Sequence, residues 1–213
     1  MKEIEISNTK LIIRNERPED FRNVEEMARN SFWNVYQPGC TEHYVLHCFR
    51  NDPDFVSQLD FVMELDGEIV GQIIFVRAHV DLDNGGKLPV MTFGPLCIAE
   101  GYKRKGYGKI LLDYAVEQAK ALGVGALLTE GNILFYGKCG FTVAKNFGVR
   151  YADDPEADYF IAKELQTGFL SGVSGIYSDP AGYFVAVNNP QKFEEYDSTF
   201  PPKQKLVLAG QLG

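Results

Sequence analysis

The sequence predicts a mixed α/β fold organised as one domain. Three observations carry this prediction: β-forming runs joined by tight turns in the first half, one long amphipathic helix over 108–122, and short strand patterns after it. At 213 residues the chain is within the size range of a single hydrophobic core. No repeat, low-complexity segment or linker-like stretch interrupts it. We therefore expect one domain over residues 1–213.

A strand over Leu11–Arg14 opens the predicted fold, and a helix begins near Pro18. Proline suits the first turn of a helix, and the acids beside it complement the helix dipole. The apolar residues that follow recur at steps of three and four, which is typical of an amphipathic helix: Phe21, Val24, Met27, Ala28 and Phe32. A second, shorter helix is expected after Thr41, whose hydroxyl suits an N-cap, and it must end before Pro53.

Three consecutive strands come next. Leu59–Leu65 and Ile69–Val80 flank Asp66-Gly67, a pair that adopts the positive φ angles of a tight hairpin turn. A second turn over 83–86 leads into Pro89–Ile98. We expect these three strands to be antiparallel.

The strongest predicted helix is Gly108–Leu122, with Gly123 at the position of a C-terminal cap. Its apolar stripe consists of Leu111, Leu112, Ala115, Val116, Ala119 and Leu122. Ala126–Thr129 reads as a short buried strand and Ile133–Lys138 as a helical turn. Later strands are predicted at Thr142–Val149, Tyr159–Leu165, Val173–Tyr177 and Tyr183–Val187.

Composition excludes several classes of function. Hydrophobic residues make up 45% and charged residues 23%, as in an ordinary globular protein. No window of about 18 apolar residues occurs, so we expect no membrane span. The net charge of -8 argues against a nucleic-acid partner, because such proteins present a basic face. Met1-Lys2-Glu3-Ile4-Glu5 lacks the apolar stretch of a signal peptide, so we expect a cytoplasmic protein.

One segment has the composition of a phosphate-binding turn. Gly101–Lys109 follows a predicted strand and opens the strongest helix. Glycines let backbone N–H groups approach a ligand, and a helix N-terminus favours negative charge. Four cations lie within seven residues: Lys103, Arg104, Lys105 and Lys109. A solvated basic loop is the alternative, while Leu111 excludes the third glycine of a dinucleotide-binding fingerprint.

Three segments together resemble the GNAT superfamily of N-acetyltransferases. They are Gly94-Pro95-Leu96-Cys97-Ile98, the loop Lys103-Arg104-Lys105-Gly106-Tyr107-Gly108, and Phe135-Tyr136-Gly137-Lys138-Cys139-Gly140-Phe141. The loop is similar to the family's Arg/Gln-x-x-Gly-x-Gly/Ala signature, and the last segment to its Tyr-x-x-x-Gly-Phe signature. The resemblance covers Leu11 to about Tyr177. Residues 166–213 are expected to be a C-terminal extension packed on the same domain.

The resemblance implies a single-domain GNAT fold of the α/β (α+β) class, with a mixed, mostly antiparallel central sheet flanked by helices. Coenzyme A would lie in the notch between two splayed parallel strands. The pantetheine would pair with the backbone of Leu96, Cys97 and Ile98, and the pyrophosphate with amides of the loop. The implied coenzyme A contacts in the loop and beyond are Lys103, Arg104, Lys105, Gly106, Tyr107, Gly108, Lys109, Asn132 and Phe135.

Tyr136 matches the family tyrosine that protonates the departing thiolate. The general base is open, because Val90–Ile98 contains none of the glutamates that many relatives use there. Glu130, Asp81 and His79 are candidates, and a water chain is a further possibility.

Other clusters weigh less. His43 and His47 stand four residues apart near Cys40 and Cys48, but a pocket or surface role is favoured over a metal, and we expect no metal. Cys97 and Cys139 read as small core residues. The acids Asp153, Asp154, Glu156 and Asp158 form either an amine-facing surface or an ordinary solvated turn.

The resemblance implies transfer of an acetyl group from acetyl-CoA to a primary amine of a small molecule or peptide, by direct attack in a ternary complex. The acceptor pocket would include the region Phe32–Phe49. The alternative is a non-catalytic GNAT-fold module that binds coenzyme A as a sensor or scaffold. The missing strand carboxylate favours this alternative, whereas Tyr136 favours the enzyme. No nucleic-acid or membrane partner is expected, and the protein would be a monomer or homodimer.

Overall fold

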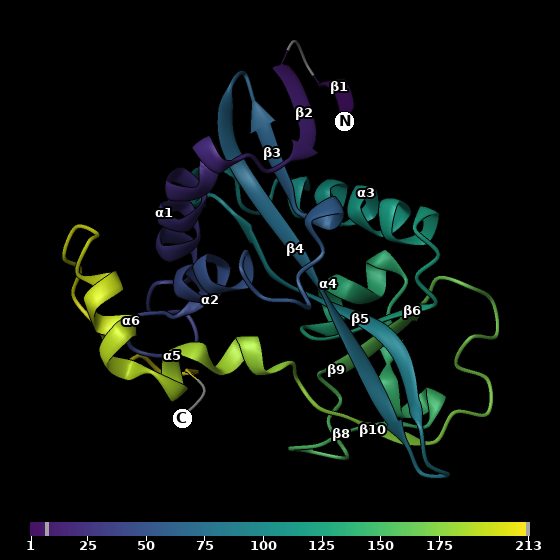
Figure 1. Ribbon diagram of the computed structural model, residues 1–213. Coiled ribbons are helices and arrows are strands. Elements are labelled where there is room, and N and C mark those ends of the chain that lie inside the picture. Colours follow the sequence, from purple (N-terminus) through teal and green to yellow (C-terminus); the bar gives the residue numbers. More distant parts are fainter. Residues whose placement is uncertain (7–8, 212–213) are drawn as a thin grey trace. The chain divides into compact units, whose positions relative to one another are not determined.

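The computed structural model describes residues 1–6 and 9–211 (Figure 1). The chain forms two compact units. Unit 1 consists of Met1–Ile74, Pro95–Leu111 and Ala181–Gly213, and unit 2 of Phe75–Gly94 and Leu112–Pro180. Two long strands and the long helix run from one unit into the other: β4 (Glu68–Leu82), β5 (Lys87–Ile98) and α3 (Tyr107–Ala121). One domain over residues 1–213 stays a prediction.

The sheet of unit 1 has the strand order β1-β2-β3-β4-β5. It consists of β1 (Lys2–Ile6), β2 (Thr9–Asn15), β3 (Phe61–Leu65) and the unit 1 parts of β4 and β5. The pairs β1–β2, β2–β3 and β3–β4 are antiparallel. The β3–β4 turn holds Asp66 at a φ of 49° and Gly67 at 89°, which confirms the predicted primed hairpin turn. Strand β1 was not among the predicted elements.

Among the described residues, four helices lie wholly in unit 1, and they are drawn in purple, blue and yellow in Figure 1. They are α1 (Phe21–Phe32), α2 (Glu42–Phe49), α5 (Val185–Asn188) and α6 (Pro190–Asp197), with α2 contacting the other three. Short 3-10 turns occur at Pro18–Asp20, Ser57–Leu59, Glu100–Tyr102 and Ala181–Phe184. Thr41 is the N-cap residue of α2, but its side chain forms no capping bond.

The predicted strand Tyr183–Val187 is wrong, because this segment is helical. Packing against α2 explains the difference. The Phe49 and Tyr183 rings meet edge to face at 4.8 Å between centroids. A Cβ at Gly182 would come within 2.2 Å of the Phe49 ring. Tertiary contact therefore overrides the β propensity of this aromatic run.

The sheet of unit 2 has the order β4-β5-β6-β9-β7, with β10 on β4 and β8 on β10. The added strands are β6 (Ala126–Glu130), β7 (Thr142–Val143), β8 (Val149–Tyr151), β9 (Phe160–Glu164) and β10 (Gly175–Tyr177). The pairs β6–β9, β7–β9 and β4–β10 are antiparallel, whereas β5–β6 and β8–β10 are parallel. In both units the sheet is open and mostly antiparallel with helices beside it, which confirms the predicted mixed α/β class.

The predicted strand Thr142–Val149 is only partly right. After β7 the chain forms a 3-10 turn over Ala144–Phe147 that ends at Gly148, where φ is 78°. A Cβ at Gly148 would come within 2.1 Å of the Val173 carbonyl oxygen. The left-handed glycine therefore ends the turn and separates two short strands.

Helix α3 forms as predicted and is followed by Gly123 at a φ of 82°. Within unit 2 its buried residues are Leu112, Tyr114, Ala115, Val116 and Ala119. Leu122, which we assigned to the apolar stripe, is 50% exposed beyond the helix end. The short helix α4 (Ile133–Tyr136) and the 3-10 turn Gly137–Cys139 lie at the predicted helical turn. No helix in the described part of the chain is long and apolar enough to cross a membrane.

Candidate functional site

The glycine loop belongs to unit 1 and presents a row of backbone amides. Arg104 and Gly106 adopt left-handed conformations, with φ of 61° and 89°, immediately before α3 begins at Tyr107. Within the described residues, the N–H groups of 104–108 donate to no backbone carbonyl, whereas those of Lys109 and Ile110 bond to the Gly106 oxygen. Left-handed turns and helix N-termini both gather N–H groups around an anion. The backbone of this loop is therefore suited to a phosphate group.

The cations of the loop have two different roles. The Lys103 ammonium donates to the Ser31 carbonyl at 2.9 Å and pairs with Glu100 at 2.6 Å. The Lys105 ammonium donates to the Gly101 carbonyl at 2.8 Å. These two lysines therefore fasten the loop to its own unit, while Arg104 is exposed. The predicted cation cluster acts in part as internal support.

The segment Leu96–Ile98 ends β5 in unit 1. The Ile98 carbonyl accepts the Ser31 hydroxyl at 3.1 Å, so α1 supports the end of this strand. Cys97 is buried, and its Sγ lies 3.9 Å from Oε1 of Gln72. Burial raises the pKa of the Cys97 thiol to about 12. The thiol is therefore protonated near neutral pH and unsuited to nucleophilic catalysis.

Strands β5 and β6 separate within unit 2. Their parallel pairing is confined to Met91 and Leu127. Further along, the Phe93 carbonyl accepts the side-chain hydroxyl of Thr129 at 3.2 Å. Gly94 then has a φ of 134°, which favours glycine. The strands splay at the position that the family resemblance implies.

Tyr136 lies in a rigid aromatic cluster of unit 2. Its ring centroid is 4.9 Å from that of Phe135, 5.6 Å from Phe141 and 5.8 Å from Phe93. A Cβ at Gly131 would come within 2.2 Å of the Tyr136 ring, so this ring lies against the backbone next to Glu130. The Tyr136 ring therefore packs on Gly131, the residue that follows Glu130 in the chain.

Asn132, expected among the coenzyme A contacts, is the N-cap of α4. Its carboxamide oxygen accepts the Leu134 N–H at 2.9 Å. The cap fixes the start of the helix that carries Phe135 and Tyr136, and the Phe135 side chain is 37% exposed. Asn132 therefore helps to position Tyr136 by capping the helix that carries it.

Glu130 is the last residue of β6 and pairs with Phe160 of β9. Glu130 is exposed, but the surrounding protein atoms desolvate its carboxyl group and raise its pKa, and the neighbouring Asp179 carboxylate raises this pKa further. The Tyr151 hydroxyl, by hydrogen bonding, acts in the opposite direction. A carboxylate with a raised pKa accepts protons more readily near neutral pH, so the surroundings of Glu130 suit a general base.

The other predicted base residues lie elsewhere in unit 2. Asp81 is 3.5 Å from the His79 ring and 3.2 Å from the Lys87 ammonium, and these exposed groups lie near the 83–86 turn. They form a surface cluster beside a hairpin turn.

The acidic residues of the segment 153–158 have different surroundings. Lys145 pairs with Glu156 at 3.4 Å and with Asp158 at 3.1 Å, as expected of a solvated turn. Asp154 accepts the Glu156 N–H through its side chain, whereas Asp153 is close enough to Glu130 to raise its pKa.

His43 and His47 have separate partners in unit 1. The buried His43 ring lies 3.0 Å from Oδ1 of Asp197 and 3.6 Å from Sγ of Cys40. The exposed His47 ring lies 3.2 Å from Oε1 of Glu25. In residues 1–6 and 9–211, no group of three or more His, Cys, Asp or Glu side chains has the arrangement of a metal site.

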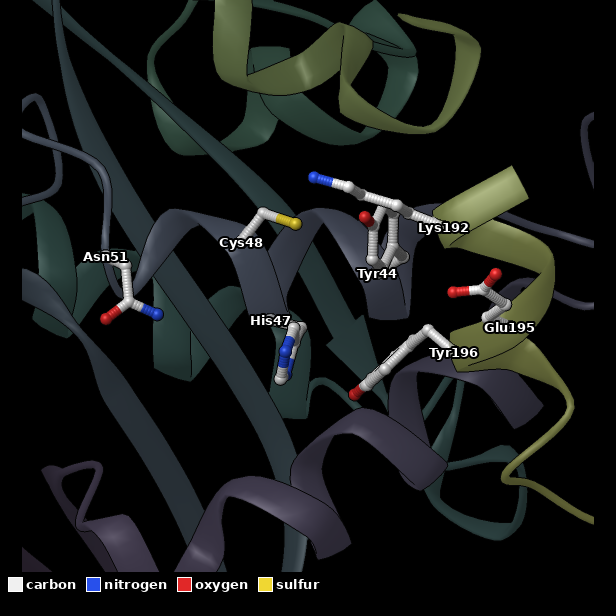
Figure 2. A pocket seen from close by; sticks show the side chains of 7 residues that line it. All are labelled: Tyr44, His47, Cys48, Asn51, Lys192, Glu195 and Tyr196. Atoms are coloured by element: carbon white, nitrogen blue, oxygen red, sulfur yellow. The ribbon is translucent and has the colours of Figure 1, made fainter. Parts of the chain in front are cut away.

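A pocket of about 490 Å³ opens between α2 and α6 of unit 1 (Figure 2). Tyr44, His47 and Cys48 line it from α2, all within the region that the resemblance gives to the acceptor. Asn51 contributes from the following turn, and Lys192, Glu195 and Tyr196 contribute from α6. The rings of Tyr44, His47 and Tyr196, which contact one another, and the opposite charges of Lys192 and Glu195 therefore line the same pocket. The sequence predictions missed α6 and with it this pocket, although Asn189-Pro190 is a recognisable helix start.

His43 makes stability depend on pH. Burial lowers its pKa to about 4, although Asp197 opposes this shift. The unfolded chain takes up the proton below a pKa of about 6.5 and the folded chain does not until about 4. We expect the free energy of unfolding to fall by up to about 3 kcal/mol as the pH drops across this window.

Urea unfolding of the parent and of His43→Gln at pH 7 and pH 4.5 measures this effect. The parent should lose clearly more stability than the variant. The pKa of Asp197 is lowered chiefly by its bond to Arg29, which both proteins keep, so the stability that Asp197 contributes is lost only at a pH below the ordinary carboxyl range. Equal losses in the two proteins would show that His43 is not the responsible group.

The model of the acetyltransferase (GNAT) family matches residues 20–141, more than half of the chain. The chain therefore belongs to the GNAT family of acetyltransferases, as the three sequence segments predicted. One relative is the protein named uncharacterized N-acetyltransferase YhbS of Escherichia coli strain K12. The two are 25% identical over 166 residues, which is 78% of this chain and 94% of the relative.

Two solved structures share the fold. The E. coli YhbS N-acetyltransferase in complex with CoA has a TM-score of 0.71 at 24% identity, over 81% of this chain and 91% of that one. A GNAT family acetyltransferase from Brucella melitensis in complex with acetyl-CoA has a TM-score of 0.64 at 19% identity, over 81% and 97%. Both likenesses support the mixed, open sheet described above.

Proposed function

We propose that the protein transfers an acetyl group from acetyl-CoA to a primary amine of a small molecule or peptide. The observation that carries this proposal is the row of amides at 104–108, at the start of α3 in a chain of the GNAT family. These amides donate to no backbone carbonyl of residues 1–6 and 9–211. The complexes of the two similar structures with CoA and acetyl-CoA support it. The cytoplasmic location and the monomer or homodimer stay predictions.

The cofactor would be bound mainly by backbone groups. The pyrophosphate would accept hydrogen bonds from the amides of 104–108, with Arg104 adding charge. The pantetheine amides would pair with the backbone of Leu96–Ile98, as an added strand pairs with a sheet edge. Lys103 and Lys105 would act indirectly, because their ammonium groups already hold the loop in place.

In the reaction, the neutral amine nitrogen attacks the thioester carbonyl carbon and the carbon–sulfur bond breaks. Tyr136 gives its phenolic proton to the departing thiolate, and Glu130 takes the proton that the amine loses. Backbone N–H groups near Leu96 and Cys97 would stabilise the carbonyl oxygen as negative charge develops there. We propose direct attack, because burial raises the pKa of the Cys97 thiol to about 12 and a protonated thiol is a poor nucleophile.

A module that binds coenzyme A without catalysis is the second candidate. One sequence feature favours it: strand β5 carries no carboxylate that could act as a base. The two candidates differ in turnover, since both would bind acetyl-CoA.

A mass-spectrometric screen tests the proposal. The protein is incubated with acetyl-CoA alone and then with a panel of primary amines and amine-bearing peptides. We expect the intact mass of the protein to stay unchanged in the first step and an acetylated amine to appear in the second. An acetylated protein that later passes its acetyl group to the amine would contradict direct attack.

A further inference from the structure

The pocket between α2 and α6 of unit 1 has a wall of aromatic rings. The ring centroids of Tyr44 and Tyr196 are 5.3 Å apart, and the His47 ring lies 4.3 Å from Tyr196 and 6.4 Å from Tyr44. Figure 2 shows side chains of the two helices pointing toward one another across the pocket. Its volume of about 490 Å³ is typical of sites for small organic molecules. The rings favour a ligand with a flat or apolar body.

A chain of buried charges holds the His47 ring in place. Nδ1 of His47 lies 3.2 Å from Oε1 of Glu25, and the same carboxylate oxygen accepts a hydrogen bond from Nη1 of Arg50. Arg50 in turn donates to both carboxylate oxygens of Glu16, at 2.8 and 2.9 Å. The side chains of Glu16, Glu25 and Arg50 are 0%, 5% and 7% exposed. The buried Glu25 carboxylate therefore fixes the orientation of the imidazole.

This orientation decides which group His47 presents to the pocket. A carboxylate paired with a guanidinium has no proton to donate, so Nδ1 of His47 supplies the N–H of the bond to Glu25. In the neutral imidazole Nε2 then carries the free lone pair, and Nε2 lies across the ring from Nδ1. The His47 side chain is 48% exposed and lines the pocket. His47 therefore offers a ligand a hydrogen-bond acceptor with a negative charge behind it.

Two opposite charges complete the lining of the pocket. Lys192 and Glu195 line it from α6, three residues apart on that helix. Within residues 1–6 and 9–211, no ion pair joins these two side chains. Figure 2 shows the Lys192 side chain extending toward α2. Both charges are therefore available to a ligand that carries their opposites.

We propose that this pocket binds a small zwitterion, a molecule with an ammonium group and a carboxylate on one aromatic or apolar body. The ammonium would lie between Nε2 of His47 and the Glu195 carboxylate, near the faces of the tyrosine rings. The ligand's carboxylate would pair with the Lys192 ammonium, and its body would cover the rings. A free aromatic amino acid has this chemistry. The proposal concerns binding and does not depend on acetyl transfer.

The lining explains why neither charge alone is sufficient. An amine without a carboxylate would meet the like charge of Lys192. A carboxylic acid without an amine would meet Glu195, and the carboxylate of Glu25 behind His47 would oppose it as well. Discrimination of this kind combines attraction to one partner with repulsion of others.

NMR titration of the full chain tests the proposal with three probes that differ by one charged group. The probes are L-phenylalanine, phenethylamine and 3-phenylpropionate, and the ring signals of His47 are assigned from His47→Gln. We expect phenylalanine to bind saturably and to shift these signals, and each single-charge probe to bind about tenfold more weakly or worse. Because acetyl-CoA is absent, the result is independent of acetyl transfer. Equal affinities for the three probes, or no saturable binding of phenylalanine, would overturn the proposal.

Two variants locate the charges that discriminate, and a third is their control. Lys192→Met should remove the preference for phenylalanine over phenethylamine, and Glu195→Gln the preference for phenylalanine over 3-phenylpropionate. Glu194→Gln changes the net charge as Glu195→Gln does, but Glu194 is an exposed residue of α6 that does not line the pocket. The control should therefore keep both preferences. Equal effects of Glu194→Gln and Glu195→Gln, or an unchanged preference in Lys192→Met, would contradict a site at this pocket.

Discussion

Replacing Tyr136 by phenylalanine should lower kcat by about a hundred- to ten-thousandfold, the usual contribution of a general acid. The ring would keep its contacts with Phe93, Phe135 and Phe141, because only the hydroxyl is removed. The departing thiolate would then lose its direct proton donor. Steady-state kinetics with acetyl-CoA and an accepted amine measure the effect.

Two controls separate catalysis from structure. The thermal midpoint and the affinity for acetyl-CoA should change little, since the aromatic cluster remains. A structural tyrosine would give near-normal turnover and about 1 kcal/mol of lost stability from a missing hydrogen bond. A phenylalanine variant that retains more than half of the parent kcat would show that the assigned role is wrong.

Replacing Gly106 by valine should weaken acetyl-CoA binding by about a hundredfold or more, which corresponds to about 3 kcal/mol. Gly106 has a φ of 89°, a conformation that a β-branched residue adopts only with strain. Apart from its chain neighbours, no residue has an atom within 4 Å of a Cβ built there, so no contact with the rest of the chain would explain a loss of affinity. The loss would come from the strained backbone, which would no longer hold the amides of the loop in their present arrangement. Isothermal titration calorimetry measures the affinity.

Gly85→Val is the matched control for this substitution. Gly85 has a φ of 88° and likewise no atom within 4 Å of a Cβ, but it lies in the turn between β4 and β5 of unit 2. The control should therefore carry similar backbone strain and bind acetyl-CoA as the parent does. Unchanged binding by Gly106→Val would remove the glycine loop from the cofactor site.

Local patterns predicted the elements that depend on local chemistry. The Asp66-Gly67 turn, the 3.6-residue period of α1 and α3 and the capping position of Gly123 all appear where expected. Helix α6 was missed although Asn189-Pro190 marks its start, and β1 was missed although Glu3-Ile4-Glu5-Ile6 alternates polar and apolar residues.

Tertiary contacts explain why the predicted strand Tyr183–Val187 is a helix in the structure. The run Tyr183–Val187 has strand-forming residues, but the Phe49 ring and Gly182 fix it as a helix. No single-sequence pattern reports such a partner, because Phe49 is more than a hundred residues away in the chain.

The parts of the candidate site that could be predicted from the sequence are those that a short, continuous motif encodes. The loop motif identified Arg104 and Gly106, whose left-handed conformations the structure shows. It did not reveal that Lys103 and Lys105 bond to carbonyl groups of Ser31 and Gly101. The contact between His47 and Glu25 was invisible in the sequence, because the two residues approach only through the packing of α1 against α2.

Amine-dependent release of the coenzyme A thiol tests the central claim most directly. Initial rates of thiol release from acetyl-CoA are measured with and without each amine of the panel, and the acetylated amine is quantified in the same samples. The proposed function predicts that thiol release requires an amine and that the two products form in equal amounts. Tight binding of acetyl-CoA without amine-dependent thiol release from any member of the panel would contradict it and would favour the non-catalytic binding module.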